Sequence, residues 1–301
     1  MSTLSLPRPK SHLLHLSDLM LLGVAMVWGS SYGVAKGALA FYPVLGFLAL
    51  RFLITFALLL PALLRADAAQ RRDALLSGLP LGALMLSIFL CETFGLALTQ
   101  ASNAAFLISL CVVFTPFVEW GLLGRRPAPA MLGFAAVSLF GAALLSGATN
   151  GGLLGHIGLG DGLMLAAALL RAVTVCMTNK LTRDRHAPAL ALTAVQSGVI
   201  GLGSLSLALL SPAGLPALPG DAGFWLASVY LVLGCTVFAF FAQNWALKHS
   251  SPSRVALLTG SEPAFGALFA VLWLGESLSP LAWAGGSLIV LAALWSGTRR
   301  S

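Results

Sequence analysis

Long apolar runs separated by short polar segments are the dominant pattern along this chain. A helix that crosses the roughly 30 Å hydrocarbon core of a bilayer needs about 20 mostly apolar residues. Ten runs of about that length can be placed between charged or Pro- and Gly-rich breaks. They are residues 18–37, 43–64, 74–98, 102–124, 129–147, 160–181, 188–210, 222–247, 253–274 and 279–297. The pattern therefore predicts an all-α membrane protein with ten transmembrane helices.

Composition and charge agree with a membrane protein and predict its orientation. The chain is 58% hydrophobic and 9% charged, whereas soluble domains carry about 25% charged residues. Of its 17 lysines and arginines, Lys36 alone falls in an outer segment if the N-terminus is cytoplasmic, and Arg51 and Arg171 lie within helices. All others fall in cytoplasmic segments, as the positive-inside rule requires. We therefore expect both termini in the cytoplasm, and we attribute the net charge of +7 to this rule rather than to nucleic-acid binding.

The first apolar run has an alternative interpretation as a cleavable signal peptide. Arg8 and Lys10 precede it, and residues 38–40 (Ala-Leu-Ala) imitate a cleavage site. Removing this helix would leave nine spans and would no longer place the basic residues on one side of the membrane, so the charge distribution favours a retained first span.

The two halves of the chain show an internal repeat. A shift of 151 residues lays residues 100–125 on residues 251–276 with six of 26 positions identical, and AALLSG at 142–147 meets AALWSG at 292–297. Three such pairs, including one between Ser17 and Gly160, occur in the same order. We predict a cytoplasmic tail at 1–17, a first repeat at 18–150 and a second repeat at 151–301. Because each repeat holds five helices, the second would be inverted, which is typical of transporters with a central substrate site.

Several short motifs resemble those of the drug/metabolite transporter superfamily, in particular its ten-helix EamA family. They are VWGSSY at 27–32, LRF at 50–52, FTP at 114–116, LLG at 122–124, SEP at 261–263 and WLGE at 273–276. The resemblance implies a bacterial inner-membrane exporter of amino acids and related metabolites, with a cavity between the repeats. Arg171 departs from the family pattern, which has tryptophan there, and so casts doubt on any substrate taken from relatives.

Five ionisable side chains lie within the predicted helices, namely Arg51, Glu92, Glu119, Arg171 and Glu262. A charge at mid-membrane costs roughly 2.5–3.5 kcal/mol on insertion scales, so each should face a cavity or a partner. Depth along the helices pairs Arg171 with Glu262 near the midplane and Arg51 with Glu92 in the outer half. Glu119 lies near the cytoplasmic interface, within reach of the arginines at 125 and 126.

Glu262 has two interpretations. In the structural one, it is permanently paired with Arg171 and locks the repeats together. In the functional one, the pair lines the cavity and offers both charge signs to a zwitterionic solute, or Glu262 takes up a proton during the cycle. Because an arginine partner holds a carboxylate ionised, proton coupling through Glu262 requires the pair to separate in one state.

Two prolines are candidate hinges. Pro263 removes the backbone donor that would bond to Thr259, so the ninth predicted helix should bend near the midplane. Pro116 has the same relation to Val112 in the fourth. Proline kinks also occur in passive membrane helices, so a purely structural role remains the alternative.

Further polar and aromatic groups are predicted to line the substrate cavity. Trp28 and Tyr32 share one face of the first helix, Asn103 begins the fourth, and Gln243 and Asn244 lie in the eighth. Such groups suit a small amphipathic solute, although helix packing and interhelical hydrogen bonds account for them equally well. The glycines at 29, 33 and 37 form a ridge for close packing within a monomer or a weak dimer.

The sequence contains no HExxH, no Walker-type glycine loop and no catalytic constellation. The four cysteines lie in apolar runs without CxxC spacing, which predicts packing residues rather than a metal site. We therefore expect no enzyme and no cofactor. The predicted function is a secondary transporter exporting small metabolites, in the first place amino acids. The alternatives are an exporter of drugs or organic cations and, from another class, an intramembrane enzyme or scaffold.

Overall fold

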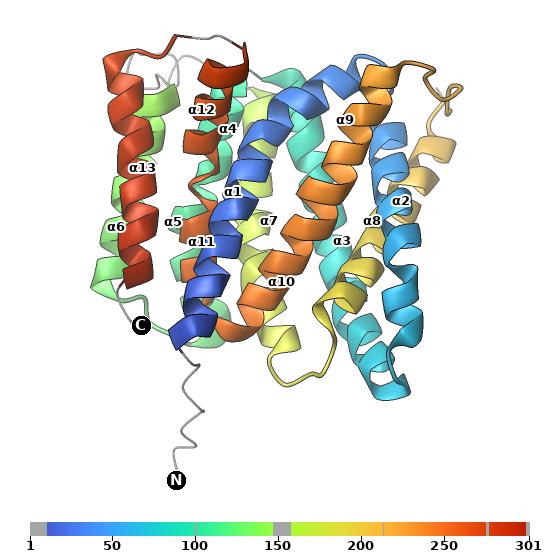
Figure 1. Ribbon diagram of the computed structural model, residues 1–301, viewed down its shortest axis with the longest axis horizontal. Coiled ribbons are helices and arrows are strands. Elements are labelled where there is room, and N and C mark those ends of the chain that lie inside the picture. Colours follow the sequence, from blue (N-terminus) through green and yellow to red (C-terminus); the bar gives the residue numbers. More distant parts are fainter. Residues whose placement is uncertain (1–10, 100, 147–157, 213, 275–276, 299–301) are drawn as a thin grey trace.

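The computed structural model describes residues 11–99, 101–146, 158–212, 214–274 and 277–298, and these residues form helices and turns without any strand. The helices stand side by side along a common axis (Figure 1). In chain order they are α1 (Ser11–Leu39), α2 (Val44–Arg65), α3 (Ala68–Leu98), α4 (Ala101–Ser109), α5 (Cys111–Leu123), α6 (Pro129–Ser146), α7 (Leu159–Thr182), α8 (Ala189–Leu210), α9 (Ala222–Val232), the π-helix η2 (Leu233–Phe238), α10 (Ala239–His249), α11 (Pro252–Thr259), α12 (Glu262–Leu274) and α13 (Pro280–Thr298). The prediction of an all-helical protein is confirmed.

Seven helical segments of the described chain are long and apolar enough to cross a membrane. They are Leu16–Leu39, Val44–Arg65, Ala68–Leu98, Phe106–Leu123, Leu159–Thr182, Ala189–Leu210 and Ala222–His249. Two apolar helices, Pro129–Leu145 and Pro280–Trp295, are shorter. The remaining predicted span, at 253–274, is divided into α11 and α12.

Some helices begin before the apolar runs that revealed them. α3 begins at Ala68 rather than at residue 74, because Asp67 accepts a hydrogen bond from the Gln70 backbone N–H at 2.8 Å and the Gln70 side chain accepts one from the Asp67 backbone N–H at 3.4 Å. This reciprocal capping starts the helix in a polar segment. Hydropathy does not register such a polar first turn, which explains the difference.

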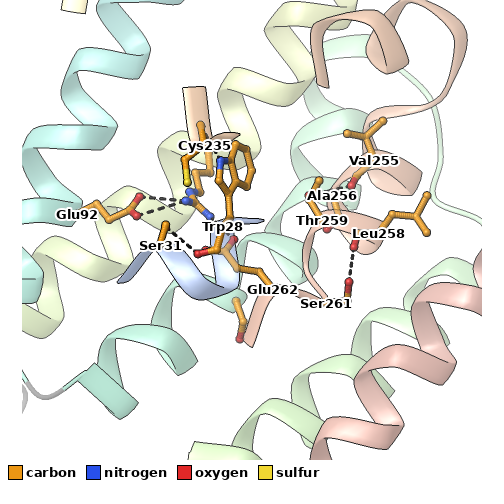
Figure 2. Close-up of polar contacts among 12 residues, drawn as sticks. Trp28, Ser31, Glu92, Cys235, Val255, Ala256, Leu258, Thr259, Ser261 and Glu262 are labelled. Carbon is orange, nitrogen blue, oxygen red and sulfur yellow. Dashed lines mark hydrogen bonds and ion pairs between the residues drawn. The ribbon is translucent and has the colours of Figure 1, made fainter. Parts of the chain in front are cut away.

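Two of the helical segments are interrupted at corresponding places. The first break is Leu110, between α4 and α5, and the second is Gly260–Ser261, between α11 and α12. Near the second break Thr259 Oγ1 donates to the Val255 carbonyl at 2.9 Å and Ser261 Oγ donates to the Leu258 carbonyl at 2.7 Å (Figure 2). The Leu258 carbonyl also accepts the Ser261 backbone N–H at 3.3 Å, so these hydroxyls add local hydrogen bonds to carbonyls next to the break.

Close glycine contacts hold several helix pairs together. A Cβ added to Gly141 of α6 would lie 2.6 Å from the Gly285 carbonyl of α13, and one added to Gly160 of α7 would lie 2.8 Å from the α3 backbone at Leu98. In the same way Gly29 of α1 approaches the backbone of α12. α2 packs along α8, and α1 packs against α10, α11 and α12. In Figure 1, α1 runs across the near face of the bundle between α12 and α10.

Candidate functional site

A cavity lies inside the bundle, lined by residues of α1, α2, α3, α5, α7, α10, α11 and α12. Its charged and polar lining includes Arg51, Glu92, Arg171, Gln243 and Glu262, and Trp28 contributes an aromatic wall. It extends to the last turns of α1 and α3, at residues 39 and 96, and to the first turn of α2. Its volume is about 100 Å³, below the roughly 300–1,000 Å³ of pockets for drug-sized ligands.

Arg171 is the centre of the charged lining. Its Nη1 lies 3.2 Å from Glu262 Oε2, and its Nη2 lies 3.2 Å from Glu92 Oε2. Nη2 also donates to Glu92 Oε1 at 3.3 Å. All three side chains are mostly buried, with 20% of Arg171, 12% of Glu92 and 5% of Glu262 exposed. One guanidinium is thus shared by two carboxylates, and this group of three carries one excess negative charge when all are ionised.

Trp28 places an aromatic face beside this group. The Arg171 guanidinium lies 5.3 Å from the centre of its ring, within the range of a cation–π contact. The ring is oriented by its own Nε1, which donates to the Cys235 carbonyl at 2.9 Å. Cys235 lies in the π-helix η2, and π-helical turns recur at functional sites. Figure 2 shows Trp28, Glu92 and Glu262 approaching one another from three different helices.

Arg51 enters the cavity from α2. Its Nε donates to Thr236 Oγ1, also in η2, at 2.9 Å. Its guanidinium carbon lies 5.2 Å from the centre of the Phe52 ring and 5.7 Å from that of Phe89. The residue is 7% exposed. Its guanidinium is hydrogen-bonded to a hydroxyl through Nε and lies beside a pair of aromatic rings.

The expected partner of Arg51 was wrong, whereas the expected contact between Arg171 and Glu262 is present. Depth alone paired Arg51 with Glu92, but Glu92 contacts Arg171, and the ion pairs of the described residues do not include Arg51. The reason is lateral position: α3 packs along α7, which carries Arg171, and only lightly against α2.

Glu262 is the first residue of α12, directly after the break in the helix. An acidic side chain is favoured at a helix N-terminus, where the backbone N–H groups point outward. Pro263 follows it and carries no N–H, which suits the first turn of a helix. The break therefore lies where Pro263 predicts a bend. Pro116, in contrast, lies inside α5, which runs unbroken from Cys111, and the corresponding break is at Leu110.

The structure places two of the other predicted cavity residues, Gln243 and Asn244, on different sides of α10. Gln243 lines the cavity. Asn244 is 4% exposed and donates instead to Thr193 Oγ1 at 3.0 Å and Gln196 Oε1 at 2.8 Å on α8. Adjacent helical positions differ in direction by roughly 100°, so the two side chains cannot share one face. Two further candidates, at positions 32 and 103, lie in α1 and α4 with side chains outside the described ones.

Below the cavity, buried polar contacts join the helices. Arg254 at the start of α11 donates to Asp18 of α1 through Nε at 3.1 Å and Nη2 at 2.5 Å. Glu119 of α5 accepts hydrogen bonds from the backbone N–H, at 3.0 Å, and the hydroxyl of Ser253, and lies 3.7 Å from Arg125. Sequence reasoning anticipated the contact with Arg125 but missed Asp18. The sequence feature that could have drawn attention to Asp18 is an acidic residue at the start of an otherwise apolar run.

Comparison with known proteins gives consistent results. The EamA-like transporter family matches residues 15–147 and, separately, residues 158–298. Two proteins of Archaeoglobus fulgidus, each named an uncharacterized transporter, are both 28% identical to this chain: one over 289 residues, covering 92% of this chain and 84% of its own length, the other over 214 residues, covering 71% and 72%. A crystal structure of a protein superposes with a TM-score of 0.74 at 22% identity, covering 93% of this chain and 95% of that one. That last likeness concerns the fold alone.

Proposed function

The chain belongs to the EamA-like transporter family, and we propose that it is a secondary transporter that exports small zwitterionic metabolites, in the first place amino acids, across the bacterial inner membrane by alternating access. The cavity supports this proposal, because it combines charges of both signs with an aromatic wall in a small volume. A zwitterion presents an ammonium and a carboxylate a few bonds apart, and such a solute matches a site that offers both charges. The same proposal includes proton coupling of export through the carboxylates that contact Arg171.

The proposed topology has ten crossings with both termini in the cytoplasm. In Figure 1, α1 begins and α13 ends at the same, lower end of the bundle. The connections α2–α3, α5–α6, α7–α8 and α10–α11 also lie at that end. The sequence places ten basic residues in or next to these connections: Arg65, Arg71, Arg72, Arg125, Arg126, Lys180, Arg183, Arg185, Lys248 and Arg254. Lys36 lies toward the opposite end of α1. The positive-inside rule then makes the lower end cytoplasmic.

Two inverted five-helix repeats are part of the proposal. The family matches the two halves separately. Moving Leu110 by the 151-residue shift places it on Ser261, so the two helix breaks coincide. The expected partners α2 and α8 pack on each other, as do α6 and α13. A pseudo-twofold axis between the halves accounts for all three observations and would put the substrate site at their interface.

The described state suits release to the outside. The cavity extends toward the upper end, at residue 39 of α1. Asp18 lies ten residues before Trp28 in the same helix, or about 15 Å below it at 1.5 Å per residue, and there it is paired with Arg254. In the proposed cycle this pair and the Glu119–Ser253 contact close the cytoplasmic side. Both would have to open for loading.

The proposal is tested by counterflow in proteoliposomes. Vesicles that contain the purified protein are loaded with one unlabelled amino acid, and uptake of its labelled form is followed across a panel. Saturable, stereoselective exchange by the wild-type protein, absent from protein-free vesicles, is the expected result. Lack of exchange for every amino acid would refute the zwitterion assignment, and exchange of organic cations in its place would favour the drug or cation exporter.

A further inference from the structure

Four charged side chains line the cavity, but they do not pair evenly. Arg171 contacts both Glu92 and Glu262, while Arg51 takes part in none of the ion pairs of the described chain. Counting charges, the first group has one negative charge in excess and Arg51 supplies one positive charge. A cavity that keeps a cation and an anionic group side by side without joining them leaves both available to a solute.

The surroundings of Arg51 hold its guanidinium in one orientation. Thr236 Oγ1 accepts the Nε hydrogen at 2.9 Å, and that hydroxyl in turn donates to the Leu231 carbonyl at 2.9 Å. The rings of Phe52 and Phe89 lie together on one side of the guanidinium, edge to face with centroids 4.7 Å apart. Within the described part of the chain, Nε alone makes a hydrogen bond. The two terminal nitrogens, which form the fork that matches a carboxylate, make no hydrogen bond to any described residue.

Burying the Arg51 guanidinium without an ion pair is costly, which argues that it has a functional role. An arginine at membrane depth costs roughly 2.5–3.5 kcal/mol on insertion scales, and such residues ordinarily pair or face a water-filled path. Arg51 is 7% exposed, and what it faces is the cavity. A hydroxyl and two rings position the group, and Glu92 attracts its charge only from beyond ion-pair distance. A solute carboxylate would pair with it directly.

We propose that Arg51 is the residue that binds the carboxylate of the transported solute. Thr236, Phe52 and Phe89 position its guanidinium. The carboxylates of Glu92 and Glu262, which contact Arg171, face the solute's ammonium. This inference rests on the proposed function, since it names the chemical class that the same cavity accepts. The solute therefore needs a carboxylate, and an amine that lacks one is a poor substrate. The arginine fork accepts two oxygens at once, so replacement by lysine restores the charge but not the two-point contact.

The test uses matched solutes in proteoliposome counterflow. The series is L-leucine with isoamylamine, which lacks the carboxylate, and 4-methylvalerate, which lacks the ammonium. A second series is L-phenylalanine with phenethylamine and 3-phenylpropionate. The proteins are wild type, Arg51→Gln, Arg51→Lys and Thr236→Val, with Arg72→Gln as the matched control, because Arg72 is an exposed arginine near the start of α3. Monodispersity in detergent and unfolding temperature identify any variant that does not fold.

For the wild type we expect exchange of the amino acid and at most weak exchange of the amine. Arg51→Gln should raise the KM for the amino acid at least tenfold and abolish the preference for it over the amine, while Arg51→Lys should recover part of the affinity. Thr236→Val keeps the charge and should raise KM by a smaller factor. Arg72→Gln should behave as wild type.

The outcomes separate this inference from the function on which it depends. If wild type exchanges an amino acid and a folded Arg51→Gln variant does so with unchanged KM, the Arg51 assignment is overturned and the transporter stands. Preferential exchange of the amines by wild type also overturns it and retains the transporter. If wild type exchanges no member of either series and no other amino acid of the counterflow panel, the proposed function itself is overturned, and the assignment with it. If Arg51→Gln does not fold, a Thr236→Val variant with unchanged KM overturns the proposal.

Discussion

Glu262→Gln should abolish most transport while leaving the protein folded. The substitution removes one of the two carboxylates at 3.2 Å from Arg171 and keeps the other, on Glu92. Arg171 therefore retains one ion pair, and neither charge is left alone in the bundle. Because glutamine is neutral, however, the group of Arg171, Glu92 and Glu262 loses its excess negative charge. The solute's ammonium then meets a neutral group.

The magnitudes follow from this arrangement. Two unit charges about 4 Å apart attract by about 4 kcal/mol at an effective dielectric constant near 20, but the desolvation of a buried carboxylate costs several kcal/mol. Gln also relieves repulsion between the two glutamates, so the net loss of stability should stay near 1–2 kcal/mol. Arg171→Gln, in contrast, removes the guanidinium that contacts both carboxylates and should cost about 3–5 kcal/mol, the value typical of breaking a buried pair.

For transport the expected loss is larger than the loss of stability suggests. A hydrogen bond to a charged group contributes about 1.5–3 kcal/mol, and about 1.4 kcal/mol is a factor of ten in affinity. Glu262→Gln should thus lower the transport kcat/KM tenfold to a hundredfold or more. Counterflow measures the rate and thermal unfolding in detergent measures the fold, with Asp184→Asn, an exposed carboxylate between α7 and α8, as the control. Wild-type exchange by a folded Glu262→Gln protein would refute the reasoning and leave Glu262 a structural residue.

Three further predictions concern packing and movement. Asp18→Asn weakens the contact with Arg254 and should make a cysteine introduced on the cytoplasmic side of the cavity more reactive toward a membrane-impermeant thiol reagent; unchanged labelling would contradict a closing role for the pair. Gly29→Val adds a Cβ that would lie 2.6 Å from backbone atoms of α12, so we expect an unfolding temperature several degrees lower, and equal stability would mean that the helices separate at no cost. Pro263→Ala restores a backbone donor at the α11–α12 break and should slow exchange severalfold, whereas Pro116→Ala, inside unbroken α5, should change it less; equal rates in both variants and wild type would remove the hinge role.

The all-helical architecture could be predicted because long apolar runs are visible directly in the order of residues along the chain. Apolar runs, charge distribution and the repeat are all properties of the order of residues, and they located the helices to within several positions. The break at Leu110 was not predictable in this way. No proline or glycine lies at that position, and the nearest candidate, Pro116, lies six residues later inside an unbroken helix.

The charged site was half predictable for a related reason. Depth along a helix can be counted from the sequence, and it placed Arg171 and Glu262 at one level. It could not decide which helix faces which, and therefore it assigned Glu92 to the wrong arginine. The π-helix η2 likewise leaves no clear mark in the apolar segment LGCTVF. Yet η2 supplies the acceptors for both Trp28 and Arg51.

The packing of the helices indicates which contact of Arg171 would break in the proposed cycle. α3 and α7 approach closely where the Gly160 position meets Leu98, so Glu92 and Arg171 belong to one tightly packed pair. α1 and α12 approach as closely at Gly29, which joins Trp28 and Glu262 in a second pair. A movement of one pair against the other would keep Arg171 with Glu92 and separate it from Glu262 and Trp28 together. Such a movement would separate the Glu262 carboxylate from Arg171 in one state alone, which is the condition that proton coupling through this residue requires.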